Sequence, residues 1–303
     1  MITTLSILIP TFNRECTNLV RTLHLQAENI DGLHYELLVA DDASTLAEVK
    51  QANRAIRDWD NCSLIELEQN VGRASIRNFL AQKAKYPYLL FLDSDVQIVS
   101  ADYLKQYLCC EADNVVYGGV CIQPNTELAA HNLRYRYELE CEPRFSVERR
   151  RVSPYQGFRT SNFLVKRDLL LQHPFDERIR HYGYEDVLFG RKLLSANIPV
   201  THMHNPVAVD DFESNEVFLR KTDEGLHTLL SLAPEMRDST SILMCVDKLQ
   251  RWHLIPLLML LYRLSSASIK RNLLGTSPSV RLYNLYRLCT YIQLQRGDNN
   301  KGV

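Results

Sequence analysis

The chain has 303 residues, 46% of them hydrophobic, and a formal net charge of −1. This composition supports a sizeable buried core and excludes a disordered chain, and the near-neutral charge gives no reason to expect nucleic acid as a partner. The charge is unevenly divided, because residues 231–303 carry ten Lys and Arg against four Asp and Glu, a net +6, which leaves −7 for residues 1–230.

Short apolar runs alternate with helical patterns through the first half of the chain, which is typical of an α/β fold with a mostly parallel sheet flanked by helices. The predicted strands are Leu5–Ile9, Tyr35–Ala40, Ser63–Glu68, Tyr88–Leu92, Val115–Ile122 and the returning strand Asn162–Lys166. The predicted helices are one from about Arg14 with Asn13 as its N-cap, then Leu46–Arg57, Ala74–Lys85, Glu185–Ala196 and Asn215–Leu232. Residues 124–159 are polar and weakly periodic, so we expect loops and a helix there.

The last part of the chain changes character. Between residues 240 and 296, Leu and Tyr recur at helical spacing with Arg and Lys between them. We therefore expect two regions, a catalytic domain at 1–230 and a basic, amphipathic helical extension at 231–303. Such helices either pack on the catalytic domain or lie in a membrane interface with their cations towards anionic lipid, and the sequence leaves both readings open.

The segment after the first predicted strand is PTFNRE, which contains no glycine. A dinucleotide fingerprint needs glycines at this point, and a phosphate-binding loop of the ATPase type needs G-x-x-x-x-G-K. Both kinds of nucleotide site are excluded here.

Acidic pairs follow two of the predicted strands. Asp41 and Asp42 end the second strand, and Asp93 and Asp95 follow the fourth. On extended backbone, carboxylates at i and i+2 project to the same side, and oxygen ligands of this kind suit Mn²⁺ or Mg²⁺. The alternative is a solvated turn that happens to contain two Asp residues.

Four segments in this order, ILIPTFNRE, VADDAS, NVGRASIRN and FLDSDV, closely resemble glycosyltransferase family two, whose members have the Rossmann-like GT-A fold. The resemblance covers roughly residues 5–225. It implies a transferase that takes a sugar from a nucleotide diphosphate donor, of which a UDP-sugar is the first candidate, with Mn²⁺ or Mg²⁺ as cofactor.

The resemblance also implies roles for individual residues. Pro10, Thr11 and Asp42 correspond to positions that contact base and ribose, with Asp41 the less favoured partner. Asp93 and Asp95 correspond to positions that meet the ribose and the metal. Asn70, Gly72, Arg77 and Asn78 match the N-x-G…R-N block, in which Arg77 either lies near the nucleotide or makes a structural ion pair.

A second landmark is HYGYEDVLFGRKL, which resembles the Gly-aromatic-Glu-Asp segment of inverting members of the family. Asp186 matches the family's general base, and Glu185 beside it would bind sugar or acceptor hydroxyls. The alternative is a helix N-terminus whose acidic residues offset the helix dipole.

The usual third metal ligand of the family, a His, is not evident. His202 and His204 precede Pro206, and the position nearest to the usual ligand is the apolar Val209. Asp210 or Asp211 would be a suitable oxygen ligand instead, so the third ligand stays open.

The expected function is inverting transfer of a hexose to a glycan or lipid-linked glycan hydroxyl, in the synthesis of a surface polysaccharide. Two alternatives are a related binding module without turnover and a nucleotidyltransferase, although the latter needs a Gly-rich loop that PTFNRE does not provide. Eight scattered Cys without a C-x-x-C pair, and an opening MITTLSILIP without a basic segment, favour the cytoplasm. A membrane-binding tail would place the protein at the inner face of the membrane.

Overall fold

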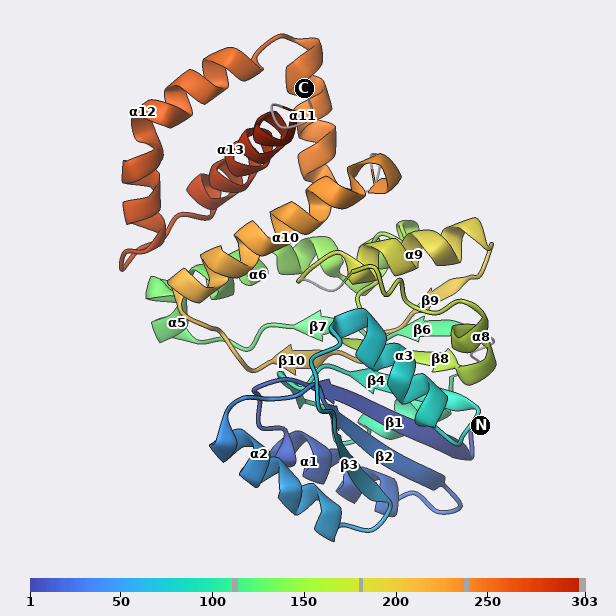
Figure 1. Cartoon of the computed structure of the whole chain (residues 1–303). Coiled ribbons are helices and arrows are strands. Elements are labelled where there is room, and N and C mark those ends of the chain that lie inside the picture. Colours follow the sequence, from blue (N-terminus) through green and yellow to red (C-terminus); the bar gives the residue numbers. More distant parts are fainter. Residues whose placement is uncertain (111–113, 180–181, 237–239, 300–303) are drawn as a thin grey trace. The chain divides into compact units, whose positions relative to one another are not determined.

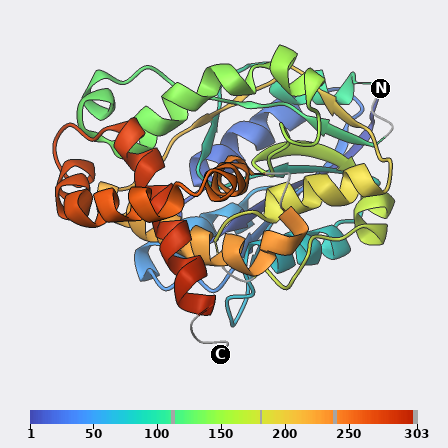
Figure 2. The same ribbon diagram turned by 90° about the horizontal axis from the view of Figure 1, so that it is seen from above.

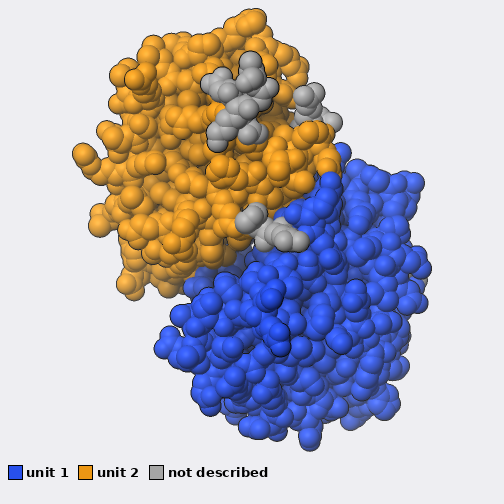
Figure 3. Space-filling model, viewed as in Figure 1, with its two compact units in different colours: residues 1–123, 142–180, 185–211 blue, residues 124–141, 181–184, 212–303 orange. Residues whose placement is uncertain are grey.

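The computed structural model describes residues 1–110, 114–179, 182–236 and 240–299. The chain forms two units, coloured separately in Figure 3. The first unit contains residues 1–123, 142–180 and 185–211, and the second contains residues 124–141, 181–184 and 212–303. The boundary expected at residue 230 falls inside one long helix, Asn215–Met236, which belongs wholly to the second unit.

The first unit is built on a seven-stranded sheet with strand order β3-β2-β1-β4-β8-β6-β9, and a smaller sheet has the order β5-β10-β7 (Figure 1). The strands are β1 (Thr4–Thr11), β2 (His34–Asp41), β3 (Cys62–Glu66), β4 (Tyr88–Leu92), β5 (Val96–Ile98), β6 (Val115–Tyr117), β7 (Val120–Cys121), β8 (Asn162–Lys166), β9 (Val200–His202) and β10 (Val207–Val209). The pairs of β1 with β2, β1 with β4, β2 with β3 and β6 with β9 are parallel, and β8 is antiparallel to both of its neighbours. The prediction of a mostly parallel α/β sheet is confirmed.

Helices cover both faces of this sheet. They are α1 (Thr17–Glu28), α2 (Ala47–Arg54), α3 (Arg73–Lys83), α4 (Tyr103–Leu108), α7 (Val147–Val152), α8 (Arg167–Gln172) and α9 (Glu185–Ser195), with short 3-10 helices η1 (Ala55–Asp58) and η2 (Glu142–Phe145). Successive residues of a strand face opposite sides, so Ile7 and Ile9 pack in the core with α1 and α4, whereas Leu8 packs with α3 and α9. A strand buried on both faces must be apolar throughout, which is why LSILI is a continuous apolar run.

Two local predictions are wrong. Asn13 is not the N-cap of α1, which begins at Thr17; it lies in the left-handed region with φ of 51° and binds the loop after β2 instead. The expected strand Val115–Ile122 is broken at Gly118 and Gly119 into β6 and β7, which lie in different sheets. A side chain at Gly118 would overlap Tyr107 and Asn162, and Gly119 has φ of +103°, so the chain changes sheets where only glycine fits.

The second unit is helical in its described parts. Its helices are α5 (Thr126–His131), α6 (Leu133–Cys141), α10 (Asn215–Met236), α11 (Ser241–Arg251), α12 (Ile255–Leu273) and α13 (Val280–Asn299). Phe218, Tyr262 and Tyr283 lie in its core, and Arg287 donates a hydrogen bond to Tyr137 across it at 3.0 Å. Figure 2 shows α13 in red running to the C-terminus.

Membrane-spanning potential is confined to one place in this unit. Among the residues that the structure describes, no single helix is long and apolar enough to cross a bilayer. Helices α11 and α12 together would be long and apolar enough to cross, but the chain bends by 116° at the break between them.

Candidate active site

The loops that follow β1, β2 and β4 lie at one edge of the sheet, because these three strands are parallel and their carboxyl ends meet there. Thr11 at the end of β1 is paired in register with Asp41 at the end of β2. Ligands of open α/β sheets bind at this edge, so the predicted nucleotide residues Pro10, Thr11 and Asp42 are brought together where the fold places ligands.

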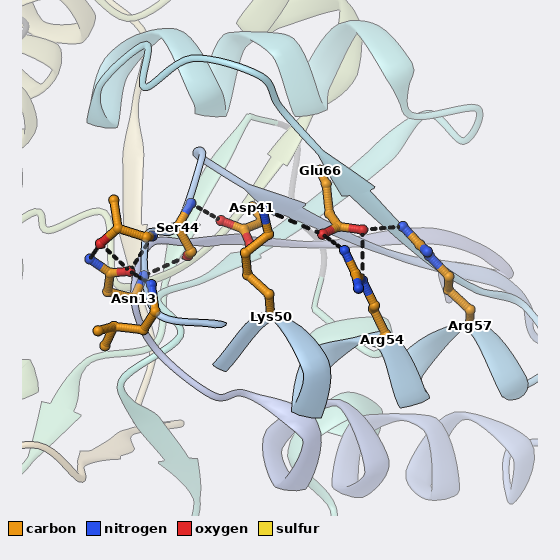
Figure 4. A network of polar contacts seen from close by, with 9 residues as sticks. Asn13, Asp41, Ser44, Lys50, Arg54, Arg57 and Glu66 are labelled. Carbon is orange, nitrogen blue, oxygen red and sulfur yellow. Dashed lines mark hydrogen bonds and ion pairs between the residues drawn. The ribbon is translucent and has the colours of Figure 1, made fainter. Parts of the chain in front are cut away.

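Polar contacts fix the loops after β1 and β2 to each other (Figure 4). The Asn13 side chain accepts hydrogen bonds from the backbone N–H of Thr45 and Leu46, at 2.7 and 3.1 Å. Ser44 Oγ accepts from Asn13 N at 2.7 Å, and Ser44 N donates to Asp41 Oδ1 at 2.8 Å. The two loops are therefore held in one arrangement before any ligand binds.

The carboxylate of Asp42 is fully engaged by the protein itself. Its Oδ1 accepts from Val71 N at 2.7 Å and its Oδ2 from Gly72 N at 3.0 Å, while Asn70 Nδ2 donates to its carbonyl. Burial raises the pKa of this carboxyl and the two N–H donors oppose the rise. Asp42 therefore anchors the N-x-G loop, in which Gly72 adopts φ of 88°.

The adjacent Asp41 is 1% exposed, and its second oxygen, Oδ2, has no hydrogen-bond partner. Buried carboxylate oxygens normally have donors, so this one is an acceptor whose partner remains to be supplied. Both carboxylate oxygens of Asp42 thus have a donor within the protein, whereas one oxygen of Asp41 has none.

The Asp93-Ser94-Asp95 segment lies between β4 and β5 as a turn. The expectation that extended backbone aligns the two carboxylates is therefore wrong. Asp93 makes ion pairs with Arg77 and, at 3.4 Å, with Arg73. Burial alone would raise the pKa of Asp93, but the two guanidinium groups outweigh it and hold the pKa below its usual value. Of the two readings of Arg77, the structure shows the ion pair.

Arg73 connects the Asp93 turn to the start of α9. Its Nε donates to Glu185 Oε1 at 2.5 Å, while its Nη2 contacts Asp93. Burial would raise the pKa of Glu185, but Arg73 and Arg77 lower it below its usual range. Oε1 of Glu185 is thus a partner of Arg73.

Arg73 is a site residue that the sequence analysis missed. It is the first residue of α3, where a positive charge is unfavourable because it meets the positive end of the helix dipole. A cation at that position signals that nearby carboxylates require it, and Asp93 and Glu185 are those carboxylates.

Asp186 follows Glu185 on the first turn of α9 and is partly buried. Burial and the neighbouring Glu185 raise the pKa of Asp186 to about 6, and Arg159 and Arg73 oppose this rise. A carboxylate whose pKa is near 6 is deprotonated at neutral pH and still takes up a proton readily, which is what a general base requires.

The antiparallel pairing of β5 with β10 places the candidate third metal ligands relative to Asp95. Val209 lies opposite Val96, and the next residue, Asp210, donates its N–H to the carbonyl of Asp95 at 3.0 Å. Asp210 and Asp211 both make ion pairs with Arg14, each at 3.2 Å. Asp210, rather than the apolar Val209, is thus the neighbour of Asp95.

His202 is occupied elsewhere. Its Nδ1 lies 2.9 Å from Arg150 Nη1 and its Nε2 2.8 Å from the carbonyl of Pro154. Burial lowers the pKa of His202 to about 4. With both ring nitrogens in contacts, this histidine is not available as a metal ligand.

A metal ion held here by protein carboxylates would complete its coordination with phosphate oxygens of the sugar donor. Within the described ranges, no group of three or more His, Cys, Asp or Glu side chains is arranged to hold a metal ion. Mg²⁺ in particular is commonly held by one or two carboxylates together with substrate phosphates. Asp95, Asp210 and Asp211 are the carboxylates at this turn, and those of Asp210 and Asp211 are held by Arg14. A cavity of about 450 Å³ beside this turn is lined by Arg14, Ser94 and Asp210, among others.

Comparison with known proteins was informative at the level of family and fold. The sequence model of "Glycosyl transferase family 2" matches residues 6–172. The chain is 36% identical over 67 residues to a teichoic acid poly(glycerol phosphate) polymerase of Staphylococcus epidermidis, which is 22% of this chain and 9% of the relative. It is 28% identical over 230 residues to the validoxylamine A glucosyltransferase of Streptomyces hygroscopicus, 65% of this chain and 53% of that one. The chain therefore spans about half or less of these curated relatives.

A solved structure with a TM-score above 0.5 covers almost the whole chain. The mannosyltransferase of Pyrobaculum calidifontis, in complex with GDP-mannose and Mn²⁺, is 15% identical and has a TM-score of 0.58. The superposition covers 97% of this chain and 87% of that one, and at this identity it shows that the fold is shared.

Proposed function

The chain belongs to glycosyltransferase family 2, and we propose that it transfers a hexose from a nucleotide diphosphate sugar to a glycan or lipid-linked glycan hydroxyl, with inversion. The observation that carries this proposal is the bridge made by Arg73 between Asp93 and Glu185. Through it, the turn expected at the donor diphosphate lies next to Asp186, the candidate base. Leaving group and nucleophile can therefore meet at one sugar carbon.

The nucleoside end of the donor is assigned to Pro10, Thr11 and Asp41, at the edge where β1 and β2 end. The unpartnered Oδ2 of Asp41 supports this assignment, because a base or ribose group that reached this buried oxygen would satisfy it. Asp42 keeps the N-x-G loop in place and acts on the donor only through that loop.

Matched substitutions at the two neighbouring aspartates separate these roles. Asp41→Asn is expected to lower UDP affinity about 10- to 100-fold, because a hydrogen bond to a charged group is lost, with little change in melting temperature. Asp42→Asn is expected to lower the free energy of unfolding by about 1–3 kcal/mol, because an amide N–H₂ would face a backbone N–H. Calorimetric UDP titration and thermal unfolding of both variants make the comparison. The assignment is wrong if Asp42→Asn loses affinity at unchanged stability.

A bound Mn²⁺ or Mg²⁺ would neutralise the charge that develops on the departing diphosphate. Asp95 and either Asp210 or Asp211 would hold it. Asp93 contributes instead by positioning the turn, since its carboxylate is held by Arg73 and Arg77.

Because the protein supplies few ligands by itself, metal and nucleotide should bind cooperatively. We expect Mn²⁺ alone to shift the melting temperature little, and Mn²⁺ with UDP to shift it by several degrees. Asp95→Ala should abolish the Mn²⁺-dependent part of the shift, whereas Asp102→Ala, at an exposed carboxylate of the same unit, should keep it. Differential scanning fluorimetry measures both. An undiminished Mn²⁺ effect in Asp95→Ala would remove Asp95 from the metal site.

The chemical step is a single displacement at the anomeric carbon. The acceptor oxygen forms a bond to that carbon while the bond to the diphosphate oxygen breaks, and the electron pair of the broken bond leaves with the diphosphate. The proton of the acceptor hydroxyl passes to Asp186, which becomes neutral. Arg73 holds Glu185 and Asp93 in place during this step.

The test of the proposed function is turnover of a panel of nucleotide sugars with Mn²⁺, beginning with UDP-sugars and including slow donor hydrolysis without acceptor. Hydrolysis would exclude the alternative of a binding module that has lost turnover. The partial match to a teichoic acid polymerase supports testing acceptors of surface polysaccharides first. A nucleotidyltransferase would instead consume a sugar phosphate and a nucleoside triphosphate.

A further inference from the structure

Helix α12 is apolar on more than one side. On one side, Tyr262, Ile269 and Leu273 are buried in the core of the second unit, where they pack with Tyr283 and Tyr286 of α13. This face explains how α12 is attached to the rest of the helical unit. Leu258 and Met259 also pack against this core, and the remaining leucines of the first half of the helix are exposed.

Four of those leucines form an outward stripe. Leu257, Leu260, Leu261 and Leu264 recur at i, i+3, i+4 and i+7, so they share one side of the helix. They are 57%, 57%, 56% and 78% exposed, respectively.

Two further exposed apolar residues lie at the break between α11 and α12: Trp252, which is 69% exposed, and Leu254, which is 44% exposed. We call these six residues the α12 surface. Single exposed leucines are common, but a contiguous set on one helix face marks an interaction site.

The charges of α11 and α12 are mostly positive. After Asp247 on α11, the sequence as far as Asp298 contains no Asp or Glu and eight Lys and Arg. Lys248, Arg251, Arg263, Lys270 and Arg271 all come from α11 and α12 and are exposed. An apolar stripe accompanied by this excess of cations complements a surface that is apolar inside and anionic outside.

We propose that the α12 surface docks on an anionic lipid bilayer, with Trp252 and the leucines in the interface and the flanking cations at the headgroups. The 116° bend between α11 and α12 is compatible with a helix that lies flat and does not cross. A second copy of the chain is a poorer occupant, because a symmetric pairing of this surface would bring its cations against one another. Trp at such a position is typical of proteins held at the membrane–water boundary.

Docking on lipid is independent of the proposed glycosyl transfer, and the two can fail separately. Binding to vesicles needs neither donor nor acceptor, whereas donor turnover needs no lipid surface. If both hold, the α12 surface brings the enzyme to a lipid-linked acceptor.

The experiment uses Trp252 as its own reporter. The chain has two Trp, and Trp59 lies in the other unit, so Trp59→Phe leaves Trp252 as the only indole. Vesicles of equal parts phosphatidylglycerol and phosphatidylcholine should shift the Trp252 emission to the blue and sediment the protein, and pure phosphatidylcholine vesicles should do so far less. Raised salt should weaken binding to the anionic vesicles.

Two substitutions test the surface against a matched control. The variant with Leu260→Glu and Leu264→Glu should lose at least tenfold in partitioning, with unchanged helicity because both side chains are exposed. Leu25→Glu, at a 48% exposed leucine of α1, should bind as the parent does. Arg263→Gln with Arg271→Gln should reduce the preference for anionic vesicles.

Three results would overturn the proposal. The first is an unshifted Trp252 emission with anionic vesicles, and the second is equal partitioning of the Leu260/Leu264 variant and the Leu25 control. The third is a dimer of the parent protein in vesicle-free buffer that the Leu260/Leu264 variant lacks, measured by analytical ultracentrifugation, because the α12 surface would then pair with a second copy.

Discussion

Replacing Asp186 by Asn is expected to lower kcat by about 10²- to 10⁴-fold and, at the same time, to make the protein more stable at neutral pH. The rate falls because Asn cannot accept the proton of the acceptor hydroxyl. The stability rises because the negative charge of Asp186 is unfavourable in the folded protein, where burial and Glu185 raise its pKa to about 6. A residue with a purely structural role would lose stability together with activity.

The pH dependence follows from the sign of this pKa shift. In the folded protein Asp186 binds its proton more tightly than in the unfolded chain. The free energy of unfolding therefore falls as pH rises from about 4 to about 6, and it falls no further from this group at higher pH. The stability difference between Asp186→Asn and the parent should therefore vanish near pH 4 and reach a few degrees in melting temperature at pH 7. Activity of the parent should rise through a half-maximal value near pH 6 and level off above about pH 7.

Glu185→Gln is the matched control on the neighbouring residue. It weakens the contact with Arg73 and should lower stability at neutral pH, which is opposite in sign to Asp186→Asn. Donor affinity by calorimetry should be almost unchanged in Asp186→Asn. If Asp186→Asn keeps near-normal turnover, or loses donor binding in proportion to rate, the base is another residue.

Asp93→Ala is expected to lower the free energy of unfolding by about 3–5 kcal/mol, because it removes a buried ion-pair partner of Arg77. Arg77 is 1% exposed, and its Nε already lacks a partner. In a protein of this size the loss corresponds to a fall in melting temperature on the order of 10 °C. Thermal and chemical unfolding measure it directly.

The double variant Asp93→Ala with Arg77→Met tests whether the ion pair is the cause. The double variant should lose less free energy of unfolding than Asp93→Ala alone, since no buried cation is left unpaired. Asp95→Ala in the same turn should have little effect on stability. Additive losses in the double variant would show that Arg77 and Asp93 do not depend on each other.

The sequence by itself predicted the fold class and most of the strands and helices that form the first unit. LSILI, YELLVA and YLLFL each predicted a strand that the structure contains, and FLDSDV and GYEDVLFG placed acidic residues at the strand end and helix start where β4 and α9 meet Arg73. These features depend on periodicity and turn chemistry over a few residues, which any stretch of sequence carries within itself.

The tertiary structure decided which partner each charged or apolar side chain has. It assigned Asp42 to the backbone of the N-x-G loop and left an oxygen of Asp41 without a donor. It paired Asp93 with Arg77 and Arg73, and it brought Asp210 beside Asp95 from more than a hundred residues away.

The same distinction applies to the tail. Helical spacing predicted α12, but only packing could show that Tyr262 faces the core while Leu264 faces outwards. The physical reason is the separation along the chain of the residues that interact. Backbone conformation responds to neighbours along the chain, whereas the partner of a buried charge and the covering of an apolar face are set by residues that are close only after folding.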